Sequence, residues 1–276
     1  MLARAKINLA LHVTGQCADG YHTLHSLVAF ADIGDEVFVE PADTDQLVAA
    51  GPFASAVPPL EDNGLSKALE CVRRWGVDAA ASKPLALHLA KYLPVASGIG
   101  GGSADMAALM RLLTGGRALT DSERSDLLTL GADVPMCFAE QPAIISGIGE
   151  VIEPIKVLPT PCVLVNPGVA ISTPAVFKAL TSRSNPPLPT WSDPVSFDGL
   201  VGYLTTTRND LMDAAISLAP EIAECLSALA DAPFARMSGS GATCFALMES
   251  DSDAVQLASD VQKAGPDWCV QATVLR

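Results

Sequence analysis

A stretch rich in glycine, PVASGIGGGSADMA at residues 94–107, has the residue types that bind an anion. Gly98, Gly100, Gly101 and Gly102 fall within five positions and precede a pattern typical of a helix. Glycines let the backbone come close to a bound group and turn N–H donors toward it, and a helix N-terminus adds partial positive charge. The stretch therefore predicts a phosphate-binding loop that needs no lysine or arginine. The alternative is an ordinary flexible turn.

The spacing departs from two other phosphate-binding patterns. A Walker A loop requires a Lys-Ser or Lys-Thr pair after its glycines, and this chain has none there. A dinucleotide fingerprint has a third glycine at the position that Ser103 occupies here. A second glycine turn, MSGSGATC at residues 237–244, lies near the end of the chain. Ser-Gly turns are common, so this turn alone is weak support. Two such loops in one chain favour a site for a polyphosphate.

The elements around the loop can be read from hydrophobic periodicity. Alternating polar and apolar residues predict strands at 6–13, 35–40 and 85–93, the last leading into the loop. Ser103 is placed to cap the helix after the loop, and Gly115–Gly116 to end it. Further expected elements are helices at 65–75, 211–218 and 221–229, a helix from a Thr120–Glu123 capping box to about Gly131, strands at 162–166, 241–249 and 268–276, and a surface loop at 183–198.

This mixture lacks regular βαβ alternation and favours an α+β fold over a doubly wound sheet. The length of 276 residues is enough for two domains, and we predict boundaries of 1–152 and 153–276. Hydrophobic residues make up 49% of the chain, which supplies a sizeable core and argues against global disorder. No apolar run is long enough to predict a transmembrane helix.

The net charge and the cysteines limit the possible partners and compartments. A formal charge of −14 repels nucleic acid and anionic membranes, so neither is expected as a partner. The seven cysteines are odd in number, widely spaced and without a CxxC pair, which argues against a disulfide framework or a zinc site and predicts reduced thiols. The N-terminus has no apolar core or cleavage site of a secretion signal. We therefore expect a cytoplasmic protein.

Three segments resemble motifs of the GHMP kinase superfamily, in the same order along the chain: AKINLALHVTG, PVASGIGGGSADMA and MSGSGATCFAL. Two further stretches, ADGYH and LGADVPMCF, resemble the branch that phosphorylates the 2-hydroxyl of 4-diphosphocytidyl-2-C-methyl-D-erythritol with ATP, in the non-mevalonate route to isoprenoids. The resemblance covers nearly the whole chain. It implies a two-domain GHMP kinase fold with the active site in the interdomain cleft. Departures from the usual pattern are Arg4 for Pro, Ile99 for Leu and Met106 for Ala.

The resemblance implies two catalytic residues. Asp133 in GADVP matches the catalytic base, which takes the proton as a hydroxyl attacks phosphorus. Lys6 matches a lysine that pairs with Asp133 and offsets charge on the transferred phosphoryl group. Asn8 shares a strand face with Lys6 and is expected to hydrogen-bond near the acceptor hydroxyl. The alternatives are a helix cap for Asp133, a solvated lysine for Lys6 and an edge-strand polar residue for Asn8.

The resemblance also implies a cytosine pocket. Tyr21 matches a residue that stacks on the pyrimidine, His22 one that hydrogen-bonds its edge, and Phe177 an opposite stacking wall. Thr173 is expected to contact the substrate nearby. The alternative for Phe177 is core packing on a short helix. From the third motif, Gly239 and Ser240 are expected near the substrate, although a tight turn explains them equally well.

ATP and Mg²⁺ are the implied cofactors, with a small molecule as the phosphate acceptor. The expected ATP-binding residues are Pro94, Val95, Ala96, Ser97, Gly98, Ile99, Gly100, Gly101, Gly102, Ser103 and Ala104. Ser103 can also touch phosphate or Mg²⁺, but no side chain is assigned as a metal ligand. His22 and His25 form an HxxH pair without a neighbouring cysteine or carboxylate to complete a metal site. We expect a monomer or weak homodimer.

Two other functions compete with this prediction. A mevalonate or homoserine kinase of the same superfamily would have no need for Tyr21, His22 and Phe177 as a base clamp. A non-catalytic nucleotide sensor on the same fold would keep the glycine loop and lose the base, whereas this chain has both Lys6 and Asp133.

Overall fold

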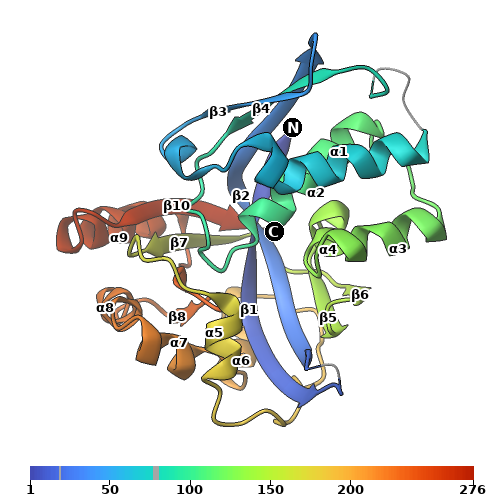
Figure 1. The fold of residues 1–276 in the computed structure, drawn as a ribbon. Coiled ribbons are helices and arrows are strands. Elements are labelled where there is room, and N and C mark those ends of the chain that lie inside the picture. Colours follow the sequence, from blue (N-terminus) through green and yellow to red (C-terminus); the bar gives the residue numbers. More distant parts are fainter. Residues whose placement is uncertain (19, 77–80) are drawn as a thin grey trace. The chain divides into compact units, whose positions relative to one another are not determined.

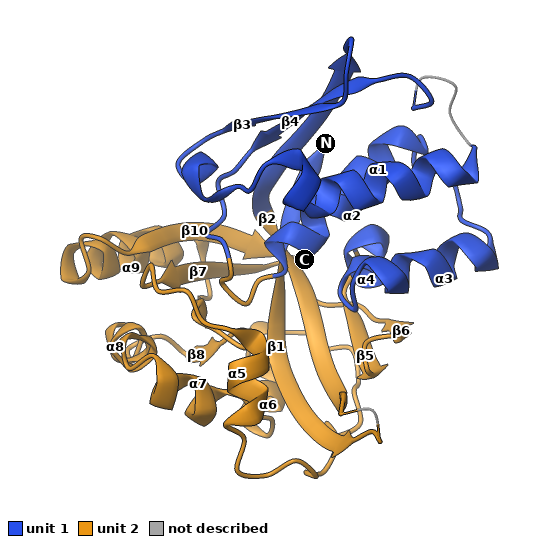
Figure 2. Cartoon of the chain, in the orientation of Figure 1, with its two compact units in different colours: residues 1–5, 33–95, 100–140 blue, residues 6–32, 96–99, 141–276 orange. Residues whose placement is uncertain are grey.

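The computed structural model describes residues 1–18, 20–76 and 81–276, which form strands mixed with helices (Figure 1). They group into two compact units that interleave along the chain (Figure 2). Unit 1 comprises residues 1–5, 33–95 and 100–140, and unit 2 comprises residues 6–32, 96–99 and 141–276. The glycine-rich stretch therefore contributes to both units. The domains 1–152 and 153–276 stay a prediction, and Asp19 of the ADGYH stretch lies outside the described residues.

Unit 1 contains a small sheet with the strand order β3-β4-β2. The strand β4 (Leu85–Ala90) pairs in parallel with β3 (Gln46–Ala50) and antiparallel with the later part of β2 (His22–Pro41). In this register Val48, His88 and Phe38 are cross-strand neighbours. The rings of Phe38 and His88 stack with centroids 4.2 Å apart, which stabilises the pairing.

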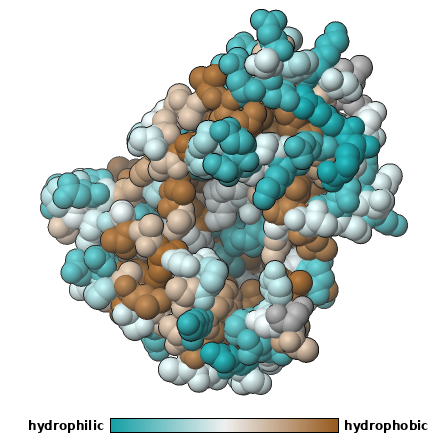
Figure 3. All heavy atoms as spheres, in the orientation of Figure 1, coloured by the Kyte–Doolittle hydropathy of each residue, from teal (hydrophilic) through white to brown (hydrophobic). Residues whose placement is uncertain are grey.

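Four helices complete unit 1: α1 (Gly64–Trp75), α2 (Gly101–Leu113), α3 (Asp121–Leu130) and α4 (Val134–Ala139). The helix α2 packs against both α1 and α4 and is buried along most of its length. Alanines at three of its buried positions allow this close packing. By contrast, α1 and α3 each keep a polar face in solvent, seen as teal side chains in Figure 3.

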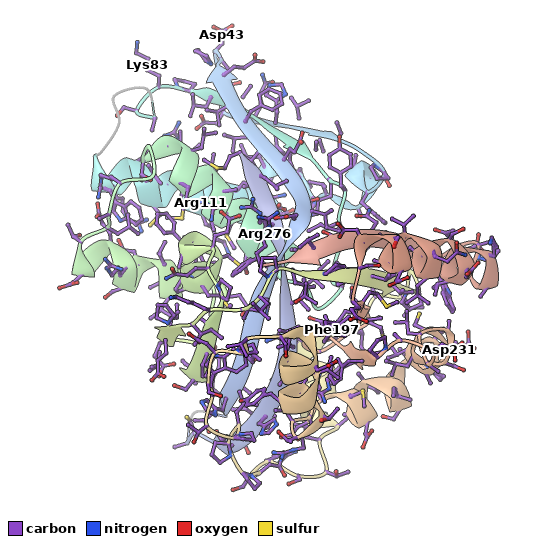
Figure 4. All side chains as sticks on the ribbon, turned by 180° about the vertical axis from the view of Figure 1, so that it is seen from behind. Asp43, Lys83, Arg111, Phe197, Asp231 and Arg276 are labelled. Carbon is purple, nitrogen blue, oxygen red and sulfur yellow. The ribbon has the colours of Figure 1, made fainter. Side chains whose placement is uncertain are left out.

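A carboxylate shared by two arginines ties the end of α4 to α2. Glu140 follows α4 in a left-handed conformation, and it contacts Arg4 at 3.3 Å and Arg111 at 3.1 Å. Arg111 lies on α2 and is labelled in Figure 4; it also donates to the carbonyl of Cys137 at 2.5 Å. Arg4, the least expected residue of the first motif, thus has a structural partner in Glu140.

Unit 2 contains a four-stranded antiparallel arrangement in the order β10-β7-β9-β8. Its strands are β7 (Thr160–Asn166), β8 (Phe234–Met237), β9 (Cys244–Leu247) and β10 (Cys269–Leu275). The strand β1 (Leu2–Gln16) pairs with β2, and β5 (Ala143–Gly147) pairs with both β2 and β6 (Val151–Pro154). The long strand β1 carries the first motif.

Helices of unit 2 bury an apolar core against these strands. They are α5 (Thr173–Lys178), α6 (Phe197–Thr205), α7 (Met212–Leu218), α8 (Glu221–Ala228) and α9 (Asp251–Ala264). The helix α9 packs on β7 and β10, and α8 packs on β7, β8 and β9. Val163, Val165 and Ile222 are among the fully buried residues of this core.

Most predicted elements are confirmed, including the capping box of Thr120 and Glu123 and the end of α2 before Gly115. The prediction that Ser103 caps α2 is wrong. The helix begins earlier, because Gly100 adopts a left-handed conformation with φ of 68° and takes the N-cap position. Ser103 is the third helical residue. The helices α4, α6 and α9 were not predicted from the sequence.

Two observations, on the cysteines and on the helices, concern the compartment of the protein. All seven cysteines fall within the described residues, and they form no disulfide. Across residues 1–18, 20–76 and 81–276, we find no helix with both the length and the hydrophobicity to span a membrane.

Candidate active site

The tip of the glycine-rich stretch, residues 96–99, is bound to the second glycine turn within unit 2, and its backbone carbonyls are the acceptors. The carbonyl of Ser97 accepts a hydrogen bond from the N–H of Thr243 at 3.1 Å. The hydroxyl of Ser238 donates to the carbonyl of Gly98 at 3.3 Å. The N–H of Lys6 donates to the carbonyl of Ile99 at 3.0 Å. Residues from all three sequence motifs therefore meet here.

Two glycines at this junction have no room for a side chain. A Cβ on Gly98 would lie 2.5 Å from the carbonyl oxygen of Gly241, and the φ of 75° is itself unfavourable for other residues. A Cβ on Gly239 would lie 2.7 Å from the carbonyl oxygen of Gly98 and 3.1 Å from Oδ1 of Asn8. Glycine is required at both positions because the two backbones lie in contact.

Asn8 lies at the centre of this junction and is buried. Its N–H donates to the hydroxyl of Ser238 at 3.0 Å, and its Nδ2 donates to the hydroxyl of Ser26 at 2.7 Å. Ser26 in turn donates to the carbonyl of Ala10 at 2.7 Å. Oδ1 of Asn8 is buried and makes no hydrogen bond within the described residues. A buried acceptor without a donor is costly, so this oxygen is suited to receive a hydrogen bond from a bound hydroxyl.

Two residues that sequence reasoning missed hold this junction in place. The Nδ2 group of Asn209 donates to the carbonyls of Met237 and Gly239, each at 2.8 Å, and so fixes the second glycine turn. Arg236 on β8 is buried and donates to the carbonyl of Leu9, next to Asn8, at 3.0 Å. Burial lowers the pKa of Arg236 to about 10, which leaves it charged at neutral pH. Both side chains donate to backbone carbonyls, and no sequence motif indicates such a contact.

The predicted substrate residues form two smaller groups in unit 2. The ring of His22 stacks on that of Phe177 with centroids 4.9 Å apart and planes inclined by 23°. Burial lowers the pKa of His22, so its ring is neutral at physiological pH, and its Nε2 is buried without a hydrogen bond among the described residues. The hydroxyls of Thr173 and Ser240 are 2.7 Å apart. Tyr21 is 63% exposed.

Asp133 in unit 1 stands at the N-cap position of α4. Its carboxylate makes no capping hydrogen bond to that helix. Pro135 lies within the first turn of the helix. The alternative of a simple helix cap is therefore not supported. A Cβ on Gly131, two residues earlier, would lie 3.9 Å from Oγ of Ser103, so the GADVP segment lies beside the start of α2.

The start of α2 presents backbone donors. The first N–H groups of a helix have no acceptor within it, and a Cβ on Gly102 would meet no atom within 4 Å, so there is open space beside this residue. Lys6 and Asp133 belong to different units, and their pairing stays a prediction. Among residues 1–18, 20–76 and 81–276, no three or more His, Cys, Asp or Glu side chains are grouped to hold a metal ion.

Family models and sequence relatives agree with one another. Residues 63–147 match the family model of the GHMP kinases N terminal domain, and residues 204–267 match that of the GHMP kinases C terminal. The 4-diphosphocytidyl-2-C-methyl-D-erythritol kinase of Chelativorans sp. is 48% identical, with 100% of this chain and 95% of the relative covered. The enzyme of the same name from Cereibacter sphaeroides is 47% identical, with 98% and 96% covered.

Solved structures give the same result at the level of the fold. A crystal structure of 4-(cytidine 5'-diphospho)-2C-methyl-D-erythritol kinase is similar with a TM-score of 0.79 at 30% identity, covering 100% of this chain and 98% of that one. A homoserine kinase from Cytophaga hutchinsonii has a TM-score of 0.60 at 16% identity, covering 100% and 95%. The second likeness concerns the fold alone.

Proposed function

The chain belongs to the GHMP kinases, and from this we propose that it transfers the γ-phosphate of ATP to the 2-hydroxyl of 4-diphosphocytidyl-2-C-methyl-D-erythritol. Its fold is the α+β fold of that family, and the chain is a kinase. The observation that carries the proposal is the junction of residues 96–99, residues 238–243 and Asn8, where a phosphate loop adjoins a buried acceptor atom.

We assign the phosphates of ATP to the glycine-rich stretch and the start of α2. The N–H groups of Gly101, Gly102 and Ser103 have no helical acceptor of their own, and the helix dipole favours negative charge there. This donor set explains how a chain of charge −14 accepts a polyanion. Mg²⁺ would neutralise phosphate oxygens, and the hydroxyl of Ser103 would contact the phosphate or the ion.

We assign the proton transfer to Asp133 and the orientation of the acceptor to Asn8. Asp133 takes the proton of the 2-hydroxyl as its oxygen attacks phosphorus, and Oδ1 of Asn8 receives a hydrogen bond from the substrate. Lys6 balances the charge of Asp133 and of the transferred phosphoryl group. None of these roles requires a covalent enzyme intermediate.

We assign the cytosine ring to Tyr21, His22 and Phe177. One face of Phe177 is already covered by His22, so these two rings form a single wall, and Tyr21 is exposed enough to stack on a base from outside. A neutral His22 with an unpaired Nε2 has one hydrogen-bonding position to offer the pyrimidine edge. This pocket distinguishes the proposed substrate from mevalonate and homoserine.

A phosphoryl-transfer assay with Mg-ATP tests the proposal. The acceptors are 4-diphosphocytidyl-2-C-methyl-D-erythritol, mevalonate and homoserine, each at equal concentration. Turnover of the cytidylylated acceptor alone is expected. Turnover of another acceptor would keep the kinase and remove the roles of Tyr21, His22 and Phe177. ATP binding without transfer to any acceptor would favour a nucleotide sensor.

The compartment and the oligomeric state also remain proposals. The reduced cysteines favour the cytoplasm. We propose a monomer or weak homodimer, which sedimentation over a range of protein concentrations would test.

A further inference from the structure

Three charged side chains form a buried cluster at the base of the glycine-rich stretch, inside unit 1. Nζ of Lys91 lies 2.5 Å from Oδ2 of Asp35 and 2.7 Å from Oδ2 of Asp105. Each of the three residues is at most 4% exposed. A single ammonium group therefore faces two carboxyl groups where water does not screen them. Three full charges would leave a buried net charge of −1, which is expensive.

The two carboxyl groups are not equivalent. Asp35 receives two further hydrogen bonds on Oδ1, from the N–H groups of Tyr92 at 2.6 Å and Leu93 at 2.8 Å. Asp105 has only Lys91 as a donor, and its Oδ1 is buried without a hydrogen bond among the described residues. Asp35 thus accepts hydrogen bonds from three donors, whereas Asp105 accepts from one. Asp105 is therefore the group on which a proton removes the excess charge.

The electrostatic environment agrees with this assignment. Burial, opposed by Lys91 and reinforced by Asp35, raises the pKa of Asp105 to about 7. The two carboxyl groups raise the pKa of Lys91 although burial acts in the opposite direction. The charged groups that face Asp105 come from β2 and from the segment after β4. The helices α1 and α4, packed against α2, bury apolar residues and the thiols of Cys71 and Cys137.

The cluster joins both ends of the glycine-rich stretch. Lys91, Tyr92 and Leu93 immediately precede it, and Asp105 lies near its other end, in the second turn of α2. A Cβ on Gly101, the first residue of α2, would lie only 3.2 Å from Nζ of Lys91 and 3.7 Å from Oδ2 of Asp35. The charges therefore lie directly behind the end of the helix that presents N–H groups to an anion.

We propose that Lys91, Asp35 and Asp105 are a positioning triad for the glycine-rich stretch, in which a single proton on Asp105 keeps the cluster neutral behind the anion-binding end of α2. When Asp105 loses this proton, the net negative charge opposes the phosphates of ATP. Affinity for ATP therefore falls as the pH rises, while the turnover of bound substrate is little affected. The inference rests on the proposed function for the identity of the anion.

The test compares the wild-type chain with Asp105→Asn, which keeps the shape of the side chain and cannot ionise. Dissociation constants for Mg-ATP are measured by calorimetry from pH 6 to 9, together with kcat and KM. For the wild type, the dissociation constant is expected to rise about 3- to 10-fold with a midpoint near pH 7. For Asp105→Asn it should stay near the low-pH wild-type value throughout. Asp43→Asn, at the exposed position labelled in Figure 4, is the matched control and should titrate like the wild type.

Each outcome decides the inference. A wild-type affinity that does not change over this range, or a parallel change in Asp105→Asn, would overturn it. If Asp105→Asn does not fold, the wild-type curve still decides, and the pair Lys91→Met and Lys91→Met/Asp105→Asn adds a second test. Here the single variant leaves two buried carboxyl groups, and the double variant should recover ATP affinity at least 3-fold. Failure of the proposed function can be told apart from failure of this inference. In that case ATP binding would still depend on pH, but no phosphoryl group would be transferred to the cytidylylated acceptor.

Discussion

The glycine-rich stretch is held by different forces at its tip and at its base. At the tip, the carbonyls of residues 97 and 98 accept neutral hydrogen bonds from the N–H of Thr243 and the hydroxyl of Ser238, and glycines bring the two backbone segments into contact. At the base, Lys91, Asp35 and Asp105 place three ionisable groups in the interior. Backbone contacts of the first kind depend little on pH, whereas a buried ionic cluster responds strongly. The stretch thus combines a tip held by neutral contacts with a base held by ionisable groups.

The largest expected effect distinguishes binding of the nucleotide from proton transfer at the acceptor hydroxyl. In the proposed mechanism, the tip and the base both act on the nucleotide, whereas Asp133 acts on the acceptor hydroxyl. Asp133→Asn should lower kcat by about 10²- to 10⁴-fold, because an amide cannot take the proton, and should leave the dissociation constant of ATP within about 2-fold. Calorimetry and steady-state kinetics measure the two quantities. Turnover close to that of the wild type would mean that Asp133 only positions the substrate.

The second effect tests whether the tip depends on backbone contact. Gly98→Ala should lower the free energy of unfolding by about 1–3 kcal/mol, because its Cβ would overlap the carbonyl of Gly241 at a positive φ. Gly102→Ala is the matched control within the same loop. Its Cβ meets open space in a helix, so up to about 1 kcal/mol of stabilisation is expected. Denaturant titrations of both variants make the comparison, and equal losses would contradict it.

The two glycine turns that meet at the tip could be recognised in the sequence, whereas their contact with each other and the cluster at the base could not. Backbone contact allows only glycine, so Gly98 and Gly239 form a recognisable pattern, and hydrophobic periodicity gave most helices and strands. The cluster at the base draws Asp35, Lys91 and Asp105 from separate parts of the chain, and their burial depends on the tertiary fold. The start of α2 was misplaced for a related reason, because the left-handed Gly100 replaced the side-chain cap expected at Ser103.

A third, intermediate effect tests the side-chain support of the tip. Asn209→Asp removes the amide donors to the carbonyls of Met237 and Gly239 but keeps the acceptor for the N–H of Leu211. The loss of these two hydrogen bonds should lower the free energy of unfolding by about 1–3 kcal/mol and raise KM. Asn209→Ala serves as the comparison, since it also removes the acceptor. If Asn209→Asp is as stable as the wild type, the turn holds its shape without this amide.

The smallest effect comes from an ion pair remote from both tip and base. Arg117 and the capping hydrogen bonds of Thr120 lower the pKa of Glu123 to about 2. A lowered carboxyl pKa contributes stability above the ordinary value of about 4.5 and loses it as the pH falls toward 2. Glu123→Gln should therefore cost about 1 kcal/mol at pH 7 and almost nothing at pH 2, because Arg117 is partly exposed and solvent screens the pair.

Urea titrations at pH 7, 4 and 2.5 measure the difference between Glu123→Gln and the wild type. This difference in the free energy of unfolding should decrease toward acid pH. The proton on Asp105 instead affects ATP affinity near pH 7, and it does not contribute to the change in this difference between pH 4 and 2.5. A difference that stays constant with pH would assign the effect of Glu123 to the helix cap geometry alone. The contrast between a partly exposed pair that titrates in acid and a buried cluster that titrates near neutrality then follows from burial and from the second carboxyl group, because desolvation and the neighbouring Asp35 together raise the pKa of Asp105 against the effect of Lys91.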